Sequence, residues 1–199
     1  MSEPAERRPR PLLAADVERL ASDAGHGDPY ARLELAHATA AALVEAGRGE
    51  SGQPTEQLVR LVEEVGLDTL SELWRDAAAD SLPGALWALY LMQTWCTRQG
   101  DAVARAYRAG RGLAPVDEVI AGVIDDADPM ALQRLADDVL TGAYEGDFDV
   151  ALERAAAFFR VVATGREQLG EDSELAARNL DTALALQRAA AGWRAGTLH

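Results

Sequence analysis

The amino-acid sequence predicts an all-α fold: a multi-helix bundle or a stack of antiparallel helical hairpins, with about nine helices and no sheet. Three observations lead to this prediction. Apolar residues recur three and four positions apart along most of the 199-residue chain, which is the spacing of one helix face. Asp, Ser, Pro and Gly stand between these segments, where helices start and stop. No segment alternates polar residues with β-branched apolar ones, as a half-buried strand would.

The chain is expected to form one domain behind a short tail. Residues 1–11 are polar and rich in Pro and Arg, so we expect a disordered N-terminal tail. Residues 12–199 are expected to form a single helical domain. The clearest loop is "GRGESGQPT", residues 47–55, which is a possible boundary inside that domain.

Each expected helix has a start or stop signal of its own. Asp28 and Asp128 each precede a proline and suit the N-cap position, because a helix tolerates proline in its first turn. Gly66 and Gly146 suit helix ends and turns. Apolar residues at helical spacing mark segments over residues 12–20, 29–44, 55–65, 68–77, 82–96, 103–110, 115–124, 129–140, 148–162 and 172–193.

The central helix is expected to lie in the core. Its sequence, "SLPGALWALYLMQTWC" over residues 81–96, contains no charged side chain. The uninterrupted apolar run is about half the length of a bilayer span. Ser81 suits the N-cap and Pro83 the first turn. A helix that is apolar on every side is usually buried, and an exposed dimer or partner face is the alternative.

The charge of the chain limits the kinds of partner that we expect, and its cysteine content indicates the cellular compartment. The formal net charge is −14 and all 19 cationic side chains are arginine, so we expect neither nucleic-acid nor membrane binding. The single cysteine, Cys96, and the absence of an apolar signal segment at the start of the sequence predict a soluble, cytoplasmic protein.

Four segments resemble a known family along nearly the whole chain. They are "RPRPLLAADVERLA", "AGHGDPYARLELAHATAAALV", "SLPGALWALYLMQTW" and "GDFDVALERAAAFFRVVATGR". They are similar to an uncharacterised all-helical family of high-GC Gram-positive bacteria, whose members often carry the automatic label "DNA-directed RNA polymerase subunit beta". Catalytic polymerase subunits are far longer mixed α/β proteins, and their metal-binding and nucleic-acid-binding signatures do not occur in this sequence. The resemblance therefore implies a helical fold and a cytoplasmic location, and it assigns no site residue.

The histidines are the first candidates for chemistry. Glu34 and His37 have the Glu-x-x-His spacing of di-iron helices, but that chemistry needs two such motifs. The sequence has only His26, His37 and His199, so a second motif is impossible. A mononuclear site that uses His26, His37 and a nearby carboxylate stays open, although His37 lies on an apolar stripe where a hydrogen-bonded core histidine is commoner.

Acidic residues and the cysteine are further candidates. A group of acids that follows residue 116 could hold Mg²⁺ or Ca²⁺, but it lacks the spacing of a calcium loop. We therefore expect Asp125 and Asp126 to lie at the solvated end of a helix and Asp128 to cap the next helix. Cys96 is expected to be buried and inert. The members of the acidic group are Asp117, Glu118, Asp125, Asp126 and Asp128.

Two functions are compatible with these residues. The first is a helical protein–protein interaction or regulatory module without catalysis, which binds another protein or itself, as a homodimer for example. Trp74, Trp193 and Arg194 are its candidate interface residues, because Trp beside Arg is typical of interface hot spots. The alternative is a metal-dependent helical enzyme, or a sensor that binds a small ligand, with a pocket near His37, where Tyr30 or Tyr107 would converge with acids. No catalytic, cofactor-binding or metal-binding residue can be assigned, and no cofactor is expected.

Overall fold

The computed structural model describes residues 29–47, 67–122, 124, 126–144 and 146–199. These residues form helices and no strand, which confirms the all-α class. The expected helices 12–20 and 55–65, the tail 1–11 and most of the 47–55 loop lie outside the described residues. The helices are α2 (Pro29–Gly47), α4 (Leu67–Trp74), α5 (Leu82–Arg98), α6 (Gly100–Arg111), α7 (Pro115–Ala121), α8 (Pro129–Tyr144), α9 (Phe148–Gln168) and α10 (Ser173–Ala195).

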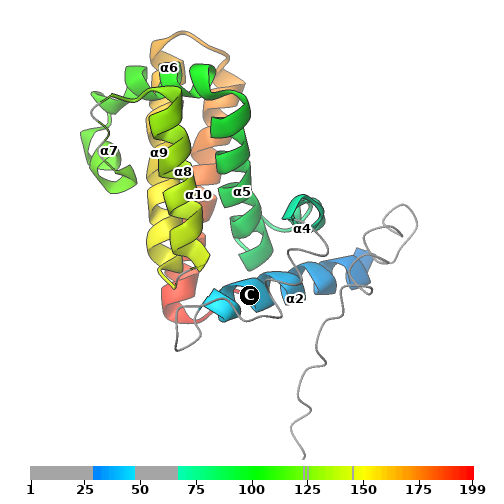
Figure 1. The fold of residues 1–199 in the computed structure, drawn as a ribbon. Coiled ribbons are helices and arrows are strands. Elements are labelled where there is room, and N and C mark those ends of the chain that lie inside the picture. Colours follow the sequence, from blue (N-terminus) through cyan, green and yellow to red (C-terminus); the bar gives the residue numbers. More distant parts are fainter. Residues whose placement is uncertain (1–28, 48–66, 123, 125, 145) are drawn as a thin grey trace, which may run out of the picture.

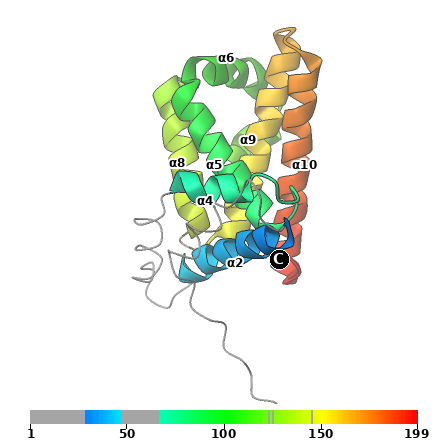
Figure 2. The same ribbon diagram turned by 90° about the vertical axis from the view of Figure 1, so that its right-hand side faces the viewer.

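Four helices stand side by side as an upright bundle. They are α5, α8, α9 and α10 (Figures 1 and 2). α6 crosses one end of the bundle and α2 crosses the other, where it meets α4 and α5. α7 stands at the outside of the bundle, against α9, near the α6 end (Figure 1). The C-terminal residues lie beside α2, at the same end of the bundle (Figure 1).

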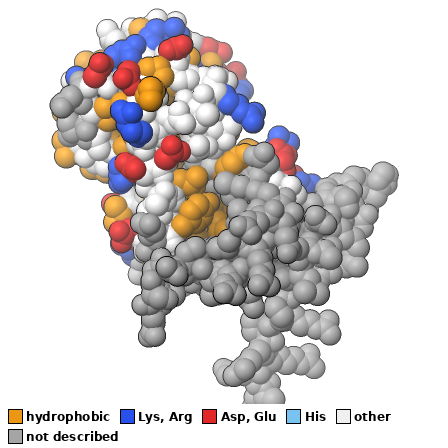
Figure 3. Space-filling view, viewed as in Figure 1, with side chains coloured by type: hydrophobic (Ala, Val, Ile, Leu, Met, Phe, Trp, Pro, Cys, Tyr) orange, Lys and Arg blue, Asp and Glu red, His pale blue; other side chains and the backbone are white. Residues whose placement is uncertain are grey.

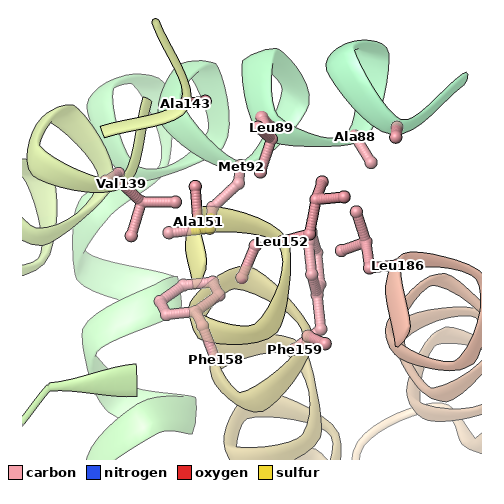
Figure 4. Close-up of a cluster of buried hydrophobic side chains, with 14 of the residues drawn as sticks. Ala88, Leu89, Met92, Val139, Ala143, Ala151, Leu152, Phe158, Phe159 and Leu186 are labelled. Atoms are coloured by element: carbon pink, nitrogen blue, oxygen red, sulfur yellow. The ribbon is translucent and has the colours of Figure 1, made fainter. Parts of the chain in front are cut away.

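The core is built around α9. Its Leu152, Phe158 and Phe159 point between the neighbouring helices and meet Met92 of α5 and Leu186 of α10 (Figure 4). Much of the remaining contact surface is alanine, which lets helix backbones approach closely. On α9 and α10 the fully buried alanines include Ala155, Ala156, Ala157, Ala183 and Ala189.

α6 and α9 cross in backbone contact. A Cβ atom at Gly110 of α6 would collide with the carbonyl oxygen of Val161, and one at Gly165 of α9 would collide with the carbonyl oxygen of Ala106. The sequence predicts only a helix end near Gly110, and α6 does end at Arg111. The close crossing depends on two glycines that are far apart in the sequence.

α5 begins as predicted but is not buried on every side. The Ser81 hydroxyl accepts a hydrogen bond from the amide of Gly84 at 3.3 Å, as expected of an N-cap. Leu86 and Leu89 lie in the core, whereas Leu91 is 43 % exposed and Trp87 is half-buried. The expectation of burial all round is therefore wrong, because no described helix covers the side of α5 that carries Leu91. Within the described ranges, no helix has the length and hydropathy needed to span a membrane.

Candidate functional site

A cavity lies where α2 crosses the end of the bundle, and one stripe of α2 forms part of its wall. His37, Ala41 and Val44 line the cavity. These residues are four and three positions apart, so they share one side of the helix. The adjoining side of α2 enters the core through Ala40 and Leu43. His37 is therefore at the edge of the core and not inside it.

The opposite wall comes from the C-terminal segment. Gly196 adopts the left-handed conformation (φ 68°), which ends α10 and turns the chain back. The amide of Thr197 then donates to the carbonyl of Gly192 at 2.8 Å. The amide of Leu82, the first residue of α5, donates to the carbonyl of His199 at 2.9 Å. These bonds hold the end of the chain against the start of α5.

The cavity has a volume of about 270 Å³ and an apolar lining with two imidazoles. Leu82, Trp193, Leu198 and His199 complete the lining. The Trp193 ring packs edge-on against Phe148 with centroids 4.8 Å apart. Among the described residues, no Asp, Glu or Arg side chain lines the cavity, so its polar groups are the two histidines and the indole N–H.

The structure places a pocket at His37 but does not bring the other expected groups to it. Tyr30 is 79 % exposed and Glu34 is also exposed. Tyr107 lies in the core, where it stacks on Phe158 with centroids 5.7 Å apart. In the part of the chain that the structure describes, no three His, Cys, Asp or Glu side chains converge as metal ligands. His26 lies outside that part.

Cys96 and Tyr107 are titratable groups buried in the core. Burial and, to a smaller extent, the charge of Asp137 raise the pKa of Cys96 to about 12, so the thiol stays protonated and inert, as predicted. Burial also raises the pKa of Tyr107 to about 12; Glu118 adds to this shift and Arg111 opposes it. The buried Tyr107 hydroxyl has no hydrogen-bond partner among the residues that the structure describes.

α7 is attached to the bundle through its charged side. Asp117 accepts a hydrogen bond from Arg160 of α9 at 2.6 Å, and Glu118 pairs with Arg111 of α6 at 3.7 Å. Ion pairs, and not apolar packing alone, thus fill the contact between α7 and its neighbours.

Arginines also bind backbone carbonyls at the end of α7 and in the loop that follows it. Arg154 donates to the carbonyl of Ala121 at 3.2 Å, and Arg108 donates to the carbonyl of Ala127 at 2.8 Å. Carbonyls at a helix C-terminus lack partners within the helix and carry partial negative charge. The guanidinium groups satisfy these carbonyls and hold the loop between α7 and α8.

The outer side of α7 is apolar. We call it the α7 apolar face; its members are Val116 (70 % exposed), Val119 (66 %) and Ile120 (40 %) of α7, and Leu113 (58 %), which precedes the helix. Next to the end of α7 is a hollow of about 390 Å³, whose charged lining residues are Arg134, Asp137, Asp138 and Arg154. Sequence reasoning missed this face, although the arginines that bind α7 could have suggested that Asp117 and Glu118 turn inward.

The structure separates the three candidate interface residues. Trp74 is 0 % exposed, and its indole N–H donates to Thr39 of α2 at 3.1 Å. Trp74 therefore joins α4 to α2 and presents no surface for a partner, which corrects the expectation for this residue. Trp193 is half-buried at the cavity. Arg194 is exposed and pairs with Asp149, at 2.8 Å, and with Glu153, both on α9.

The remaining acidic candidates do not converge. Asp128 accepts a hydrogen bond from the amide of Ala131 at 2.7 Å and so caps α8, as the sequence predicts. Asp126 is exposed, and Asp125 lies outside the described residues. The described acids of this group therefore have separate roles: one caps α8, two form ion pairs on α7, and one is exposed to solvent.

Figure 3 shows arginine and acidic side chains interspersed with hydrophobic ones over the upper part of the bundle. Comparison of the chain with models of protein families, with curated proteins and with solved structures found no match.

Proposed function

We propose that this protein is a cytoplasmic, non-catalytic interaction module that binds another protein through the α7 apolar face. The observation that supports the proposal is the orientation of α7. A helix at the surface of a domain ordinarily turns its apolar side inward, whereas α7 turns its acids toward Arg111 and Arg160 and its valines outward. Burial of a large aliphatic side chain contributes about 1.5–3 kcal/mol, so a partner that covers this face gains from several such side chains.

The partner we infer is an amphipathic helix with basic residues beside its apolar stripe. Its apolar side chains would cover Val116 and Val119, and its basic side chains would meet the exposed Asp126 and Asp138. The hollow beside the end of α7 is lined by Asp137 and Asp138 and also by Arg134 and Arg154, so it suits an uncharged anchoring side chain, while the exposed Asp138 at its rim meets a basic one. The net charge of −14 favours a basic partner over a second copy of the chain, which would carry the same charge.

A photo-cross-linking experiment in the native host tests the proposal. Benzoylphenylalanine is placed at Val119, and at Leu184 of α10 as a matched exposed aliphatic control (51 % exposed). We expect one cross-linked product at position 119 and none at 184. The cross-linked partner peptide is expected to be amphipathic with Arg or Lys at its flanks, and Val116→Asp is expected to abolish the product.

Three outcomes would contradict the proposal. Equal cross-linking at positions 119 and 184 would mean that contacts are non-specific. A product that persists in Val116→Asp would mean that the α7 apolar face does not bind. A product of twice the chain mass would show self-association in place of a basic partner. The cross-linking experiment does not test the family resemblance, which stays a prediction.

A further inference from the structure

The cavity at His37 is separate from the α7 apolar face. The C-terminal segment and α2 lie at one end of the bundle, and α7 lies near the other (Figure 1). The interaction that we propose for α7 does not use this cavity. Its lining must therefore be explained separately.

The volume of the cavity limits the size of a ligand. A buried apolar cavity of about 150 Å³ accommodates benzene, and this cavity measures about 270 Å³. It therefore has room for one aromatic ring or for two fused rings. The aliphatic side chains of Val44 and Leu82 and the indole of Trp193 supply an apolar lining for such rings.

The polar groups of the cavity limit the charge of a ligand. Among the described residues, no Asp, Glu or Arg side chain lines the cavity, so a charged ligand would find no carboxylate or guanidinium side chain to pair with. A neutral imidazole has one hydrogen-bond donor and one acceptor. A hydroxyl group can both donate and accept, so it matches the imidazoles of His37 and His199.

The walls of the cavity are held in place before a ligand arrives. The bond from the Leu82 amide to the His199 carbonyl fixes the last residue, and the Gly196 turn fixes the segment before it. Trp193 is held by its edge-on contact with Phe148. A site that is already formed loses little conformational entropy when it binds a ligand.

We propose that this cavity binds a small uncharged aromatic compound with a hydroxyl group, of the size of phenol or naphthol. The rings lie against Trp193, Val44 and Leu82. The hydroxyl group bonds to the imidazoles of His37 and His199. The protein is thus a receptor for such a compound in addition to being an interaction module.

The first test is the binding of 2-naphthol to the full chain, measured by calorimetry and by shifts of backbone amide resonances. Ala41→Phe fills the cavity from α2, so it is expected to abolish binding. Ala38→Phe is the matched control, because Ala38 is exposed on the same helix, and it is expected to bind 2-naphthol as the unchanged chain does. Equal binding by both variants, or no binding by the unchanged chain, would overturn the proposal.

The second test separates the imidazoles from the apolar lining. His37→Leu and His199→Leu are each expected to weaken 2-naphthol binding by roughly 3- to 10-fold, the effect of one neutral hydrogen bond. The binding of naphthalene, which lacks the hydroxyl, is expected to stay the same in both variants. A parallel loss for naphthalene would mean that the histidines only shape the cavity and would overturn their assigned role.

The charge of the ligand and the independence of the site are tested with three further measurements. 2-Naphthoate and Zn²⁺ are each expected to bind more weakly than 2-naphthol. Tighter binding of either would replace the uncharged ligand with an anion or a metal ion. Val116→Asp, on the α7 apolar face, is expected to leave 2-naphthol binding unchanged, so failure of one proposal does not imply failure of the other.

Discussion

The indole N–H of Trp74 donates a hydrogen bond to the hydroxyl of Thr39, 3.1 Å away, in a part of the core where both side chains are buried. The same hydroxyl lies 2.9 Å from the carbonyl of Leu35, one turn earlier in α2. Thr39 thus connects the backbone of α2 to the last residue of α4. This connection fixes the position of α2, which carries His37 to the cavity.

Thr39→Val is expected to destabilise the protein by about 1–3 kcal/mol, because it leaves the buried indole N–H without an acceptor while it keeps the side-chain volume. Urea unfolding followed by circular dichroism measures the effect. Thr182→Val is the control, since that hydroxyl bonds only to the carbonyl of Arg178 in its own helix. An equal loss in both variants would show that the bond between α2 and α4 is unimportant.

Gly165→Ala is expected to destabilise the fold by about 3 kcal/mol or more, because the new methyl group collides with the backbone of α6 at Ala106 and overpacking of a rigid contact is costly. Gly142→Ala in α8 is the matched substitution. A Cβ atom there meets nothing within 4 Å, so alanine is expected to stabilise the helix by about 0.5–1 kcal/mol. Thermal unfolding distinguishes the two, and a mild effect at position 165 would contradict the close crossing.

Arg160→Met is expected to loosen α7 without unfolding the bundle, because it removes the pair with Asp117 and keeps the aliphatic stem. Amide hydrogen exchange should speed up in residues 115–121 and stay unchanged in α10. Arg178→Met, which removes an exposed pair with Glu174, is expected to have little effect on either segment. Unchanged exchange in α7 after Arg160→Met would mean that other contacts hold this helix.

The stability of the protein is expected to fall above pH 9. The pKa of Cys96 is raised from 9.0 to about 12 on folding and that of Tyr107 from 10.0 to about 12. The unfolded chain therefore releases these protons first, and stability is lost as pH rises through this window. Urea unfolding between pH 8 and 11 measures the slope.

Tyr107→Phe is expected to reduce that slope above pH 10 and to leave stability at pH 7 equal or higher, because it removes a buried hydroxyl that has no partner among the described residues. Tyr30→Phe is the control, since Tyr30 is largely exposed. A clear loss of stability at pH 7 in Tyr107→Phe would mean that the hydroxyl is hydrogen-bonded in solution.

Local signals in the sequence predicted helix starts well. Ser81 and Asp128 each bond to an amide three residues ahead, because a cap is a contact between near neighbours. A pocket near His37 belonged to the second of the two functions that the sequence allows. Its other wall depends on the turn at Gly196, which brings the end of α10 back to α5, and no pattern around His37 reveals this.

The sequence by itself determined the all-α class, the positions of the caps and the tendency of each segment to have an apolar side. Only the tertiary structure decided which side of a helix is covered. On α10, Leu180 and Leu184 face solvent, whereas Ala183 and Leu186 are buried against the bundle, because only one side of α10 packs on α9. Hydrophobic periodicity depends only on the side chains of one helix. Burial also depends on the neighbouring helices and on ion pairs with them, as the inward-facing acids of α7 show.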